Sequence, residues 1–233
     1  AKAFSKLGAQ TILVDKDEIA LKESVAKLGV GHKYFPIDVT HSDAANQAML
    51  AAINNFGGLD ILISNAGAAH AGPMLDISNE ELRNAFELNF FSHYSFSTEA
   101  AKILKDQNRG GQILFNISKQ AVNPGKNFGA YGLPKATTFF LMRQLALELG
   151  SDGIRVNGIN ADRIRSGLLT DDFISSRAKS RGVSESEYMA GNLLNKEVTA
   201  EHVADAFTAL ACAESTTGHV MTVDGGNIEA SLR

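Results

Sequence analysis

Tyr131 and Lys135 are the pair of residues in this chain best suited to moving a proton. They stand at the start of an apolar-periodic segment, residues 137–149, which predicts a helix. Side chains four residues apart on a helix share one face, with Cβ atoms roughly 6 Å apart. We expect an ammonium so close to a phenol to favour the phenolate and lower the pKa of Tyr131, which would make the phenol a usable general acid or base.

A tyrosine followed by a lysine one turn later is more often a plain surface pair, so other residues must support the interpretation. Ser118 follows an expected strand thirteen residues before Tyr131. Its hydroxyl can reach a substrate oxygen near the phenol, or it simply caps the strand end. Asn89 lies inside an expected helix, where asparagine is disfavoured, so it is either functional or a satisfied polar residue between helices. Asp15 ends a strand and either accepts the hydroxyls of an adenosine ribose or caps the next helix.

Short apolar runs alternate with helical patterns along the whole chain. The expected strands are residues 11–14, 34–37, 59–64, 112–117, 154–159 and 219–223, and the expected helices are 17–28, 42–56, 78–105, 137–149 and 199–211. This alternation predicts an α/β fold, a doubly wound parallel sheet with helices on both faces. Ligands of such sheets bind at the carboxyl ends of the strands, where Asp15, Asp38, Asn65, Ser118 and Asn160 fall.

Composition narrows the function classes. The chain has 233 residues, 44% of them hydrophobic, which predicts one domain over residues 1–233. A net charge of −4 argues against nucleic acid and anionic membranes as partners. Cys212 is the only cysteine, so no intrachain disulfide can form and a cytoplasmic location is expected. We expect no membrane span, no signal peptide and no metal site.

An ordered series of short motifs resembles the short-chain dehydrogenase/reductase family. The motifs are Asp38-Val39, Asn65-Ala66-Gly67, Asn89, Ser118, Tyr131-x-x-x-Lys135, Ile154-Arg155-Val156-Asn157, Thr217-Gly218 and Val223-Asp224-Gly225-Gly226. Each is weak alone, but their order and spacing cover nearly the whole chain. The resemblance implies a Rossmann-like fold and an NAD(P)-dependent oxidoreductase. Such an enzyme transfers hydride between a nicotinamide and a small hydroxy or carbonyl compound.

The resemblance also implies roles for single residues. Tyr131 would exchange the substrate proton, and Lys135 would hold the nicotinamide ribose. Ser118 would orient the substrate carbonyl, and Asn89 would hold a water that links Lys135 to solvent. The remaining cofactor contacts would come from Asp15 at the adenosine ribose, Asp38 and Val39 at the adenine, Asn65, Ala66 and Gly67 beside the cofactor, and Ser166 at the carboxamide.

Two departures from the family pattern fall after the fifth strand. The family usually has Pro-Gly where this chain has Ala161-Asp162, and usually threonine where it has Ser166. Asp162 adds a charge whose partner the sequence does not identify. Residues 163–195 are polar and weakly periodic, and are expected to form a substrate lid. Segment 160–169 and the tail Asp224-Gly225-Gly226-Asn227 are similar to the dehydrogenase half of bifunctional aldolase/short-chain dehydrogenases of deoxysugar breakdown.

The largest departure from the family pattern is at the N-terminus. The family's first strand and its glycine-rich phosphate loop are expected to be missing, which describes an N-terminally truncated member. The strands at 11–14 and 59–64 are then expected to close up as direct neighbours, with the pairing of Leu13 as the deciding observation. Without the loop, no dinucleotide is expected to bind in the family's manner. The alternative function is therefore a non-catalytic scaffold that keeps the fold and the oligomer.

Two further expectations concern cofactor choice and assembly. Asp15 would repel a 2′-phosphate, so NAD is preferred over NADP, although Lys16 beside it weakens the discrimination. The helix at 78–105 carries Leu82, Phe86, Phe90, Phe91, Tyr94 and Phe96, and the helix at 137–149 carries Phe139, Phe140, Leu141, Leu145 and Leu147. These apolar arcs are wider than one sheet face needs, which indicates a homotetramer of two-fold dimers or a homodimer.

Overall fold

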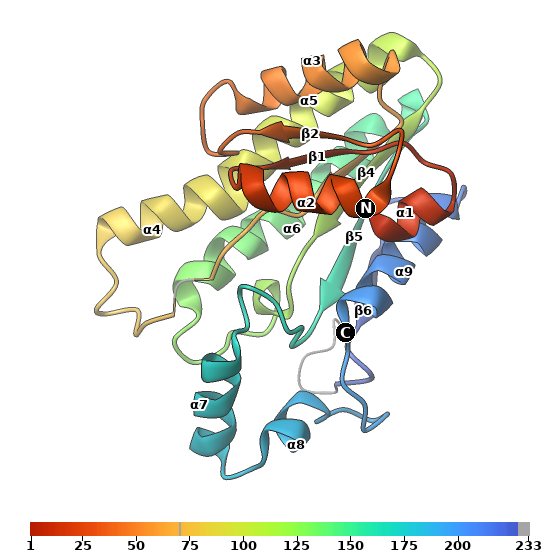
Figure 1. The fold of residues 1–233 in the computed structure, drawn as a ribbon. Coiled ribbons are helices and arrows are strands. Elements are labelled where there is room, and N and C mark those ends of the chain that lie inside the picture. The colour runs from red at the N-terminus through yellow and green to blue at the C-terminus, as the bar shows by residue number, and fades with distance from the viewer. Residues whose placement is uncertain (70, 228–233) are drawn as a thin grey trace.

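The computed structural model describes residues 1–69 and 71–227 and arranges them as helices packed around parallel strands (Figure 1). The strands are β1 (Ile12–Asp15), β2 (Lys33–Pro36), β3 (Ile61–Ser64), β4 (Gly111–Asn116), β5 (Ile154–Ala161) and β6 (Val220–Val223). The longer helices are α2 (Glu18–Leu28), α3 (Ala44–Phe56), α4 (Asn79–Phe86), α5 (Ser92–Gln107), α6 (Gly129–Leu149), α7 (Asp171–Arg181) and α9 (Ala200–Cys212), and the short ones are α1 (Lys2–Lys6) and α8 (Glu185–Met189). The expected α/β class is confirmed; the last six residues of the predicted domain lie outside the described part.

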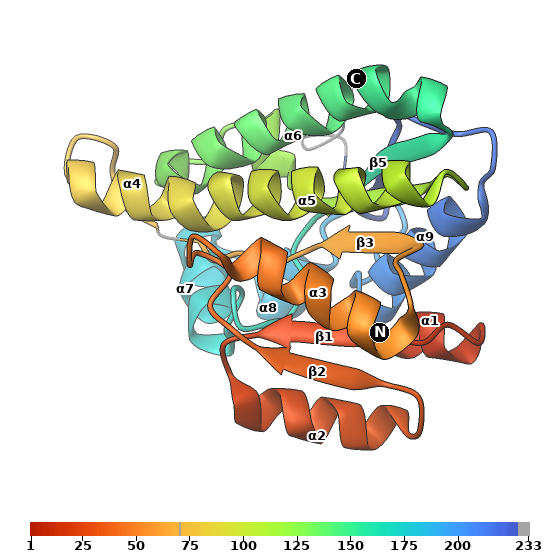
Figure 2. The same cartoon turned by 90° about the horizontal axis from the view of Figure 1, so that it is seen from above.

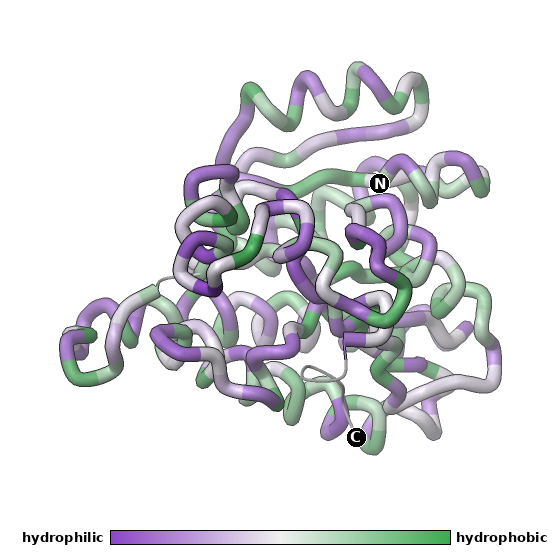
Figure 3. The backbone as a smooth tube through the Cα atoms, turned by 90° about the horizontal axis from the view of Figure 1, so that it is seen from below, coloured by the Kyte–Doolittle hydropathy of each residue, from purple (hydrophilic) through white to green (hydrophobic). Residues whose placement is uncertain are grey.

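The main sheet is covered by helices on both faces, as expected for a doubly wound fold. Along β4, Ile113 and Phe115 face a core shared with α3, α5 and α6, while Leu114 between them faces a second core. That second core holds Phe4 of α1 and Phe207 of α9. Alternate side chains of a strand point to opposite faces, so a strand buried on both sides reads as a continuous apolar run. The outer helices alternate hydrophilic and hydrophobic segments instead (Figure 3).

The described strands form two parallel sheets rather than one. β1 pairs with β2, and β3, β4, β5 and β6 form a separate sheet in that order. Leu13 has Tyr34 of β2 as its partner, so the expected closure of β1 onto β3 is wrong. Figure 2 shows the β1–β2 pair lying apart from β3. Helices connect the two sheets, because α3 packs on α5 and α1 packs on α9.

The segment expected as a single helix at 78–105 contains a π-helical turn. Ser78 caps α4 and exchanges hydrogen bonds with Glu81, the predicted capping box. A π-helical turn, Glu87–Phe91, then joins α4 to α5 and carries the buried Asn89. One extra residue per turn rotates the side chains around the helix, and such turns often occur at functional sites.

The expected lid, residues 163–195, contains two helices that the sequence did not resolve. α7 begins at the Thr170 cap and ends at Gly182, and α8 begins at a Ser184–Glu187 capping box. They pack on each other through a small core of Ile174, Ala178, Tyr188 and Met189. Both helices lie beyond the carboxyl ends of β4 and β5 (Figure 1).

Candidate active site

The first turns of α6 place Tyr131 and Lys135 side by side, as predicted. Both side chains are buried, and the Lys135 ammonium lies 5.8 Å from the centre of the Tyr131 ring. Lys135 Nζ donates a hydrogen bond to the main-chain oxygen of Asn116, at 2.9 Å. The end of β4 therefore fixes the lysine, and the lysine fixes the face of α6 that carries the phenol.

Burial outweighs the expected effect of Lys135 on the pKa of the tyrosine. Burial raises the pKa of Tyr131 above its usual 10.0, and the hydrogen bond with Ser118 only partly opposes this. Burial also lowers the pKa of Lys135 from 10.5 to about 8. The prediction of a lowered tyrosine pKa was wrong because it counted the charge attraction between neighbours and not the removal of both groups from water. At neutral pH the phenol is protonated and therefore poised as a proton donor.

Ser118 lies where β4 runs into the loop before α6. Its hydroxyl accepts from the Gln120 main-chain N–H at 3.2 Å and also hydrogen-bonds the Tyr131 phenol. Ser118 therefore caps a short turn and touches the tyrosine, and its contact with a substrate oxygen stays a prediction. The Ser118 and Tyr131 hydroxyls together can bind one substrate oxygen.

Asn89 is tied to the chain on all sides. Its amide nitrogen donates to the carbonyls of Ala68 at 2.9 Å and Ala85 at 3.1 Å, and its amide oxygen accepts from the Ala68 N–H at 3.3 Å. Its main-chain carbonyl accepts the Thr138 hydroxyl of α6 at 2.7 Å. These bonds connect the π-helical turn, the loop after β3 and α6, so Asn89 holds together the elements that surround Lys135.

The loop after β3 forms a close wall beside the lysine. Asn65 accepts a hydrogen bond from the Asn116 amide at 2.8 Å, which joins the ends of β3 and β4. A Cβ atom on Gly67 would lie 2.8 Å from the Asn89 amide oxygen and 3.6 Å from Lys135 Nζ. Only glycine fits there without displacing Asn89. Gly67 thus presents bare backbone next to the ammonium, which suits close approach by a flat ring and its ribose.

The acidic residues named for the adenosine end lie on the smaller sheet. Asp15 is exposed at the end of β1, and one of its oxygens accepts from the Asp17 N–H at 3.0 Å. Asp17, not Asp15, caps α2. Asp38 accepts from the N–H and hydroxyl of Thr40, and these bonds hold the pKa of its carboxyl below the usual range. Val39 packs toward the main core instead of standing free.

A cavity of about 410 Å³ opens in front of Ser118 and Tyr131. One wall is the turn after β4, and the opposite wall comes from the lid and includes Ser166, Phe173 and Tyr188. The Ser166 hydroxyl donates to the Ile164 carbonyl at 3.1 Å and accepts from main-chain N–H groups within its own turn. Residues of the segment 163–195 thus form one wall of this cavity, and its role as a substrate lid stays a prediction.

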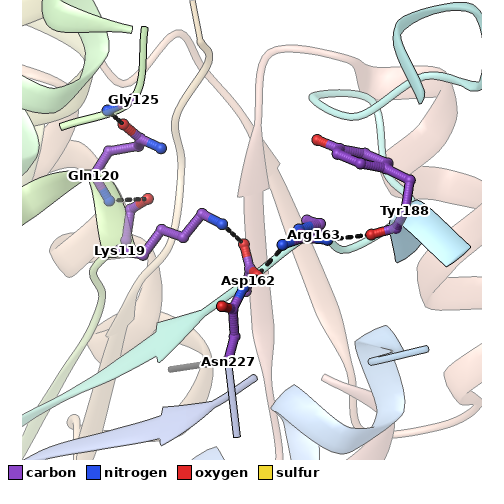
Figure 4. A network of polar contacts seen from close by, with 8 residues as sticks. Lys119, Gln120, Gly125, Asp162, Arg163, Tyr188 and Asn227 are labelled. Carbon is purple, nitrogen blue, oxygen red and sulfur yellow. Dashed lines mark hydrogen bonds and ion pairs between the residues drawn. The ribbon is translucent and has the colours of Figure 1, made fainter. Parts of the chain in front are cut away.

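Asp162 is the centre of a polar cluster at the cavity floor (Figure 4). The buried carboxylate forms ion pairs with Lys119 and with Arg163, the latter at 3.2 Å, and accepts from the Asn227 amide at 2.5 Å. Arg163 continues to the Tyr188 main-chain oxygen and lies over the Tyr188 ring, 4.8 Å from its centre. Asp162 therefore joins β5, the turn after β4, the lid and the segment after β6.

Sequence reasoning missed most of this cluster. Lys119, Arg163, Tyr188 and Asn227 are far apart in the chain, and no short motif connects them. The one available signal was the charged Asp162 at a position where the family carries a small uncharged residue. Within residues 1–69 and 71–227, no group of histidine, cysteine and acidic side chains could hold a metal ion. The same residues include no helix with the length and apolarity to cross a bilayer.

Comparison with known proteins now decides the family. The family model described as enoyl-(acyl carrier protein) reductase matches residues 1–227. The chain is a short-chain dehydrogenase/reductase. The 3-ketoacyl-(acyl-carrier-protein) reductase from Brucella melitensis, crystallised with NADH, is 25% identical and superposes with a TM-score of 0.85 over 97% of this chain and 90% of that one.

Curated relatives agree with this short-chain dehydrogenase fold. The 7alpha-hydroxysteroid dehydrogenase of Escherichia coli is 30% identical over 98% of this chain and 88% of its own length. The uncharacterized oxidoreductase YuxG of Bacillus subtilis is 35% identical over 82% of this chain, but that match spans only 29% of YuxG. These comparisons give no support to the expected loss of the first strand and loop.

Proposed function

We propose that this short-chain dehydrogenase transfers hydride between a nicotinamide cofactor and a small hydroxy or carbonyl compound. The observation that carries the proposal is the buried Tyr131, hydrogen-bonded to Ser118 and next to Lys135, on the wall of a cavity large enough for a small metabolite. The nicotinamide supplies or accepts the hydride when bound. Tyr131 supplies or accepts the proton at the substrate oxygen.

The proton balance follows from the burial of Tyr131. Its raised pKa keeps the phenol protonated at neutral pH, so the reduction direction can use it directly as an acid. Ser118 holds the carbonyl oxygen from a second side. In the oxidation direction the phenol must first lose its proton, so we expect that rate to rise with pH. A water by which Lys135 exchanges protons with solvent would have to bind the amide oxygen of Asn89, which accepts one hydrogen bond, from the Ala68 N–H, in the described structure.

The residues present fit a nicotinamide adenine dinucleotide at its two ends. At the nicotinamide end, Lys135 would bind the ribose, Asn65, Ala66 and Gly67 would line the ring, and Ser166 would meet the carboxamide. At the other end, Asp15 would bind the adenosine ribose, and Asp38 and Val39 would meet the adenine. Preference for NAD over NADP is part of the proposal, because the Asp15 carboxylate repels a 2′-phosphate. Equal or tighter binding of NADP would contradict it.

The finer subfamily assignment rests on the likeness of residues 160–169 and of the tail Asp224-Gly225-Gly226-Asn227 to the dehydrogenase half of bifunctional aldolase/dehydrogenases. We propose that this chain corresponds to the dehydrogenase part of a bifunctional aldolase/dehydrogenase, and that its substrate is a small aldehyde or alcohol derived from a deoxysugar. A cytoplasmic location is proposed with it. If an aldolase activity for a ketose 1-phosphate co-purifies with the native protein, the link to an aldolase is supported. If a different, unrelated activity co-purifies instead, the link is refuted.

Assembly into a homotetramer or homodimer is proposed from two exposed apolar helix faces. Phe140 and Leu147 on α6 are 68% and 80% exposed, and Phe91 and Tyr94 near the start of α5 are about half exposed. A two-fold contact places the same patch on both subunits, so these two helices can cover each other's apolar side chains. Light scattering at micromolar concentration is expected to give a multiple of 24.9 kDa, and a monomer would contradict the proposal.

A second candidate is a non-catalytic scaffold that keeps the fold without using a dinucleotide. The observation in its favour is that β1 and β3 do not pair in the described sheets. An edge with unpaired main-chain groups is unusual inside a doubly wound fold. The intact Asn89, Ser118, Tyr131 and Lys135 set favours the enzyme.

The Tyr131→Phe substitution tests the proposed chemistry. Phenylalanine keeps the packing of the ring and removes the proton-transfer group, so turnover with NAD(H) is expected to fall by about 10²–10⁴-fold. Tyr94→Phe is the matched control, because it deletes a phenol that is half exposed on α5 and outside the cavity. A Tyr131→Phe protein that keeps most of its rate would refute the assignment.

A further inference from the structure

The cavity in front of Tyr131 is strongly basic although the protein carries a net charge of −4. Five basic side chains and one carboxylate line it: Lys119, Lys126, Arg163, Arg177, Arg181 and Asp162. Lys119 and Arg163 both pair with Asp162. Within the described residues, the other three basic side chains have no carboxylate partner. The positive charge is therefore not neutralised by this part of the chain.

Arg177 is the basic residue most clearly prepared for a ligand. Its guanidinium lies over two aromatic rings, 5.5 Å from the centre of Phe128 and 5.9 Å from that of Phe173. Its Nε is screened from solvent and has no hydrogen-bond partner among the described residues. A buried donor without a partner is costly and rare in folded proteins. The rings hold the planar group in place, so it is preorganised to bind a planar or tetrahedral anion with two parallel hydrogen bonds.

The position of Arg177 connects it to the reacting residues. Phe128, which the guanidinium covers, caps α6, and its carbonyl accepts from the Tyr131 N–H at 3.1 Å. A single aromatic ring therefore separates the arginine from the helical turn that carries the phenol. Arg177 and Tyr131 line the same cavity of about 410 Å³. A ligand of a few carbon atoms fits within this space.

We infer that the substrate carries an anionic group, a carboxylate or a phosphate, which binds Arg177 while its hydroxyl or carbonyl lies between Ser118 and Tyr131. The inference rests on the proposed oxidoreductase function and narrows its substrate class. Arg181 and Lys126 add positive charge at the same cavity and draw the anion in. The competing explanation is that Arg177 only clamps the lid to α6 by stacking.

Matched substrate pairs separate these explanations. Wild-type protein is assayed with NAD on lactate against 1,2-propanediol, on 3-hydroxybutyrate against 1,3-butanediol, and on glycerol 3-phosphate against glycerol. At least one anionic member is expected to exceed its neutral partner in kcat/KM by about 10- to 100-fold, as a charged hydrogen-bonded contact contributes. Arg177→Gln is expected to remove this ratio through KM. Arg177→Lys keeps the positive charge but cannot form two parallel hydrogen bonds, so it is expected to keep part of this ratio.

Lys179→Gln is the control, because it removes one positive charge from the same helix at an exposed residue outside the cavity lining. It is expected to leave the ratio unchanged. The substrate pair with the largest ratio of kcat/KM shows whether the bound anion is a carboxylate or a phosphate. Equal kcat/KM for charged and neutral members in the wild type would overturn the inference without any variant. Loss of rate on both members alike in a folded Arg177→Gln protein would identify the stacking clamp instead.

A binding measurement keeps the inference apart from the proposed function. Calorimetric titration of the cofactor-free protein with pyruvate, inorganic phosphate and neutral hydroxyacetone needs no turnover. Tighter binding of pyruvate or phosphate than of hydroxyacetone, lost in Arg177→Gln and kept in Lys179→Gln, supports the anion site even if no substrate is oxidised. No preference for either anion in the wild type would overturn it even if the enzyme is active on neutral alcohols.

Discussion

The reacting end of α6 and the lid at residues 163–195 are built in different ways. Tyr131 and Lys135 stand on a long helix that packs into the main core, with Asn116 of β4 and the loop after β3 fixing them. The lid helices pack mainly on each other, around the four-residue core of Ile174, Ala178, Tyr188 and Met189. Polar contacts through Asp162 and Arg163 connect that unit to the rest.

This difference separates two tasks. The reacting residues need a fixed geometry, which only a large shared core provides. The substrate wall can vary in shape and charge, because its small core is independent of the sheet. Changes at α6 should therefore act on every substrate alike, and changes in the lid should act on substrate choice and local stability.

Lys135→Met is expected to have the largest effect and to move activity and stability in opposite directions. Loss of the ammonium should reduce turnover by about 10²-fold or more on all substrates. The lysine pKa, lowered from 10.5 to about 8 by burial, corresponds to about 3 kcal/mol of unfavourable free energy at neutral pH. The folded-state pKa lies below the unfolded one, so this cost is full below pH 8 and disappears as pH rises toward 10.5.

Urea unfolding at pH 7 and pH 10.5 measures the free energy of unfolding of the wild type and of Lys135→Met. At pH 7 the variant is expected to be the more stable protein. The gain is at most about 3 kcal/mol, is reduced by the lost hydrogen bond to Asn116, and should disappear at pH 10.5. A variant destabilised equally at both pH values would contradict the burial argument.

Asp162→Asn is the strongest test of the contacts that connect the lid to the sheet. Removing the carboxylate leaves Lys119 and Arg163 facing each other, and burial already lowers the pKa of Lys119. Breaking such a pair is expected to cost about 3 kcal/mol in the free energy of unfolding. Asp171→Asn is the control, because that exposed carboxylate pairs with Arg165 at 2.7 Å and should cost less than about 1 kcal/mol. Equal costs in urea titrations would argue against the cluster as a structural connection.

The smallest effect is expected from the same substitution, Ile→Val, made once in each region. Ile113 of β4 and Ile174 of α7 are both fully buried, so Ile→Val at each removes one methylene from a packed core. Each should cost about 0.5–1.5 kcal/mol. Ile113→Val should weaken amide-exchange protection throughout the sheet, and Ile174→Val only in α7 and α8. Identical exchange patterns would show that the lid is not an independent unit.

Local rules explain which features the sequence could predict. The four-residue spacing of Tyr131 and Lys135 and the Ser78 capping box depend on neighbours in the chain, and they lie in the structure as expected. The direction of the Tyr131 pKa shift depends on burial, which no spacing reveals. The partners of Asp162 and the pairing of β1 depend on contacts distant in the chain. The partners of Asp162 were missed, and the expected Tyr131 pKa shift and β1 pairing were wrong.

Titration of the protein with NADH, followed by nicotinamide fluorescence, tests the central claim most directly. A nicotinamide bound against Lys135 and Gly67 would lie in reach of Tyr131. We therefore expect a saturable fluorescence increase with one site per chain, weaker with NADPH and weaker still in Lys135→Met. An unchanged spectrum up to millimolar NADH, from a protein that melts cooperatively, would contradict the account and favour the non-catalytic scaffold.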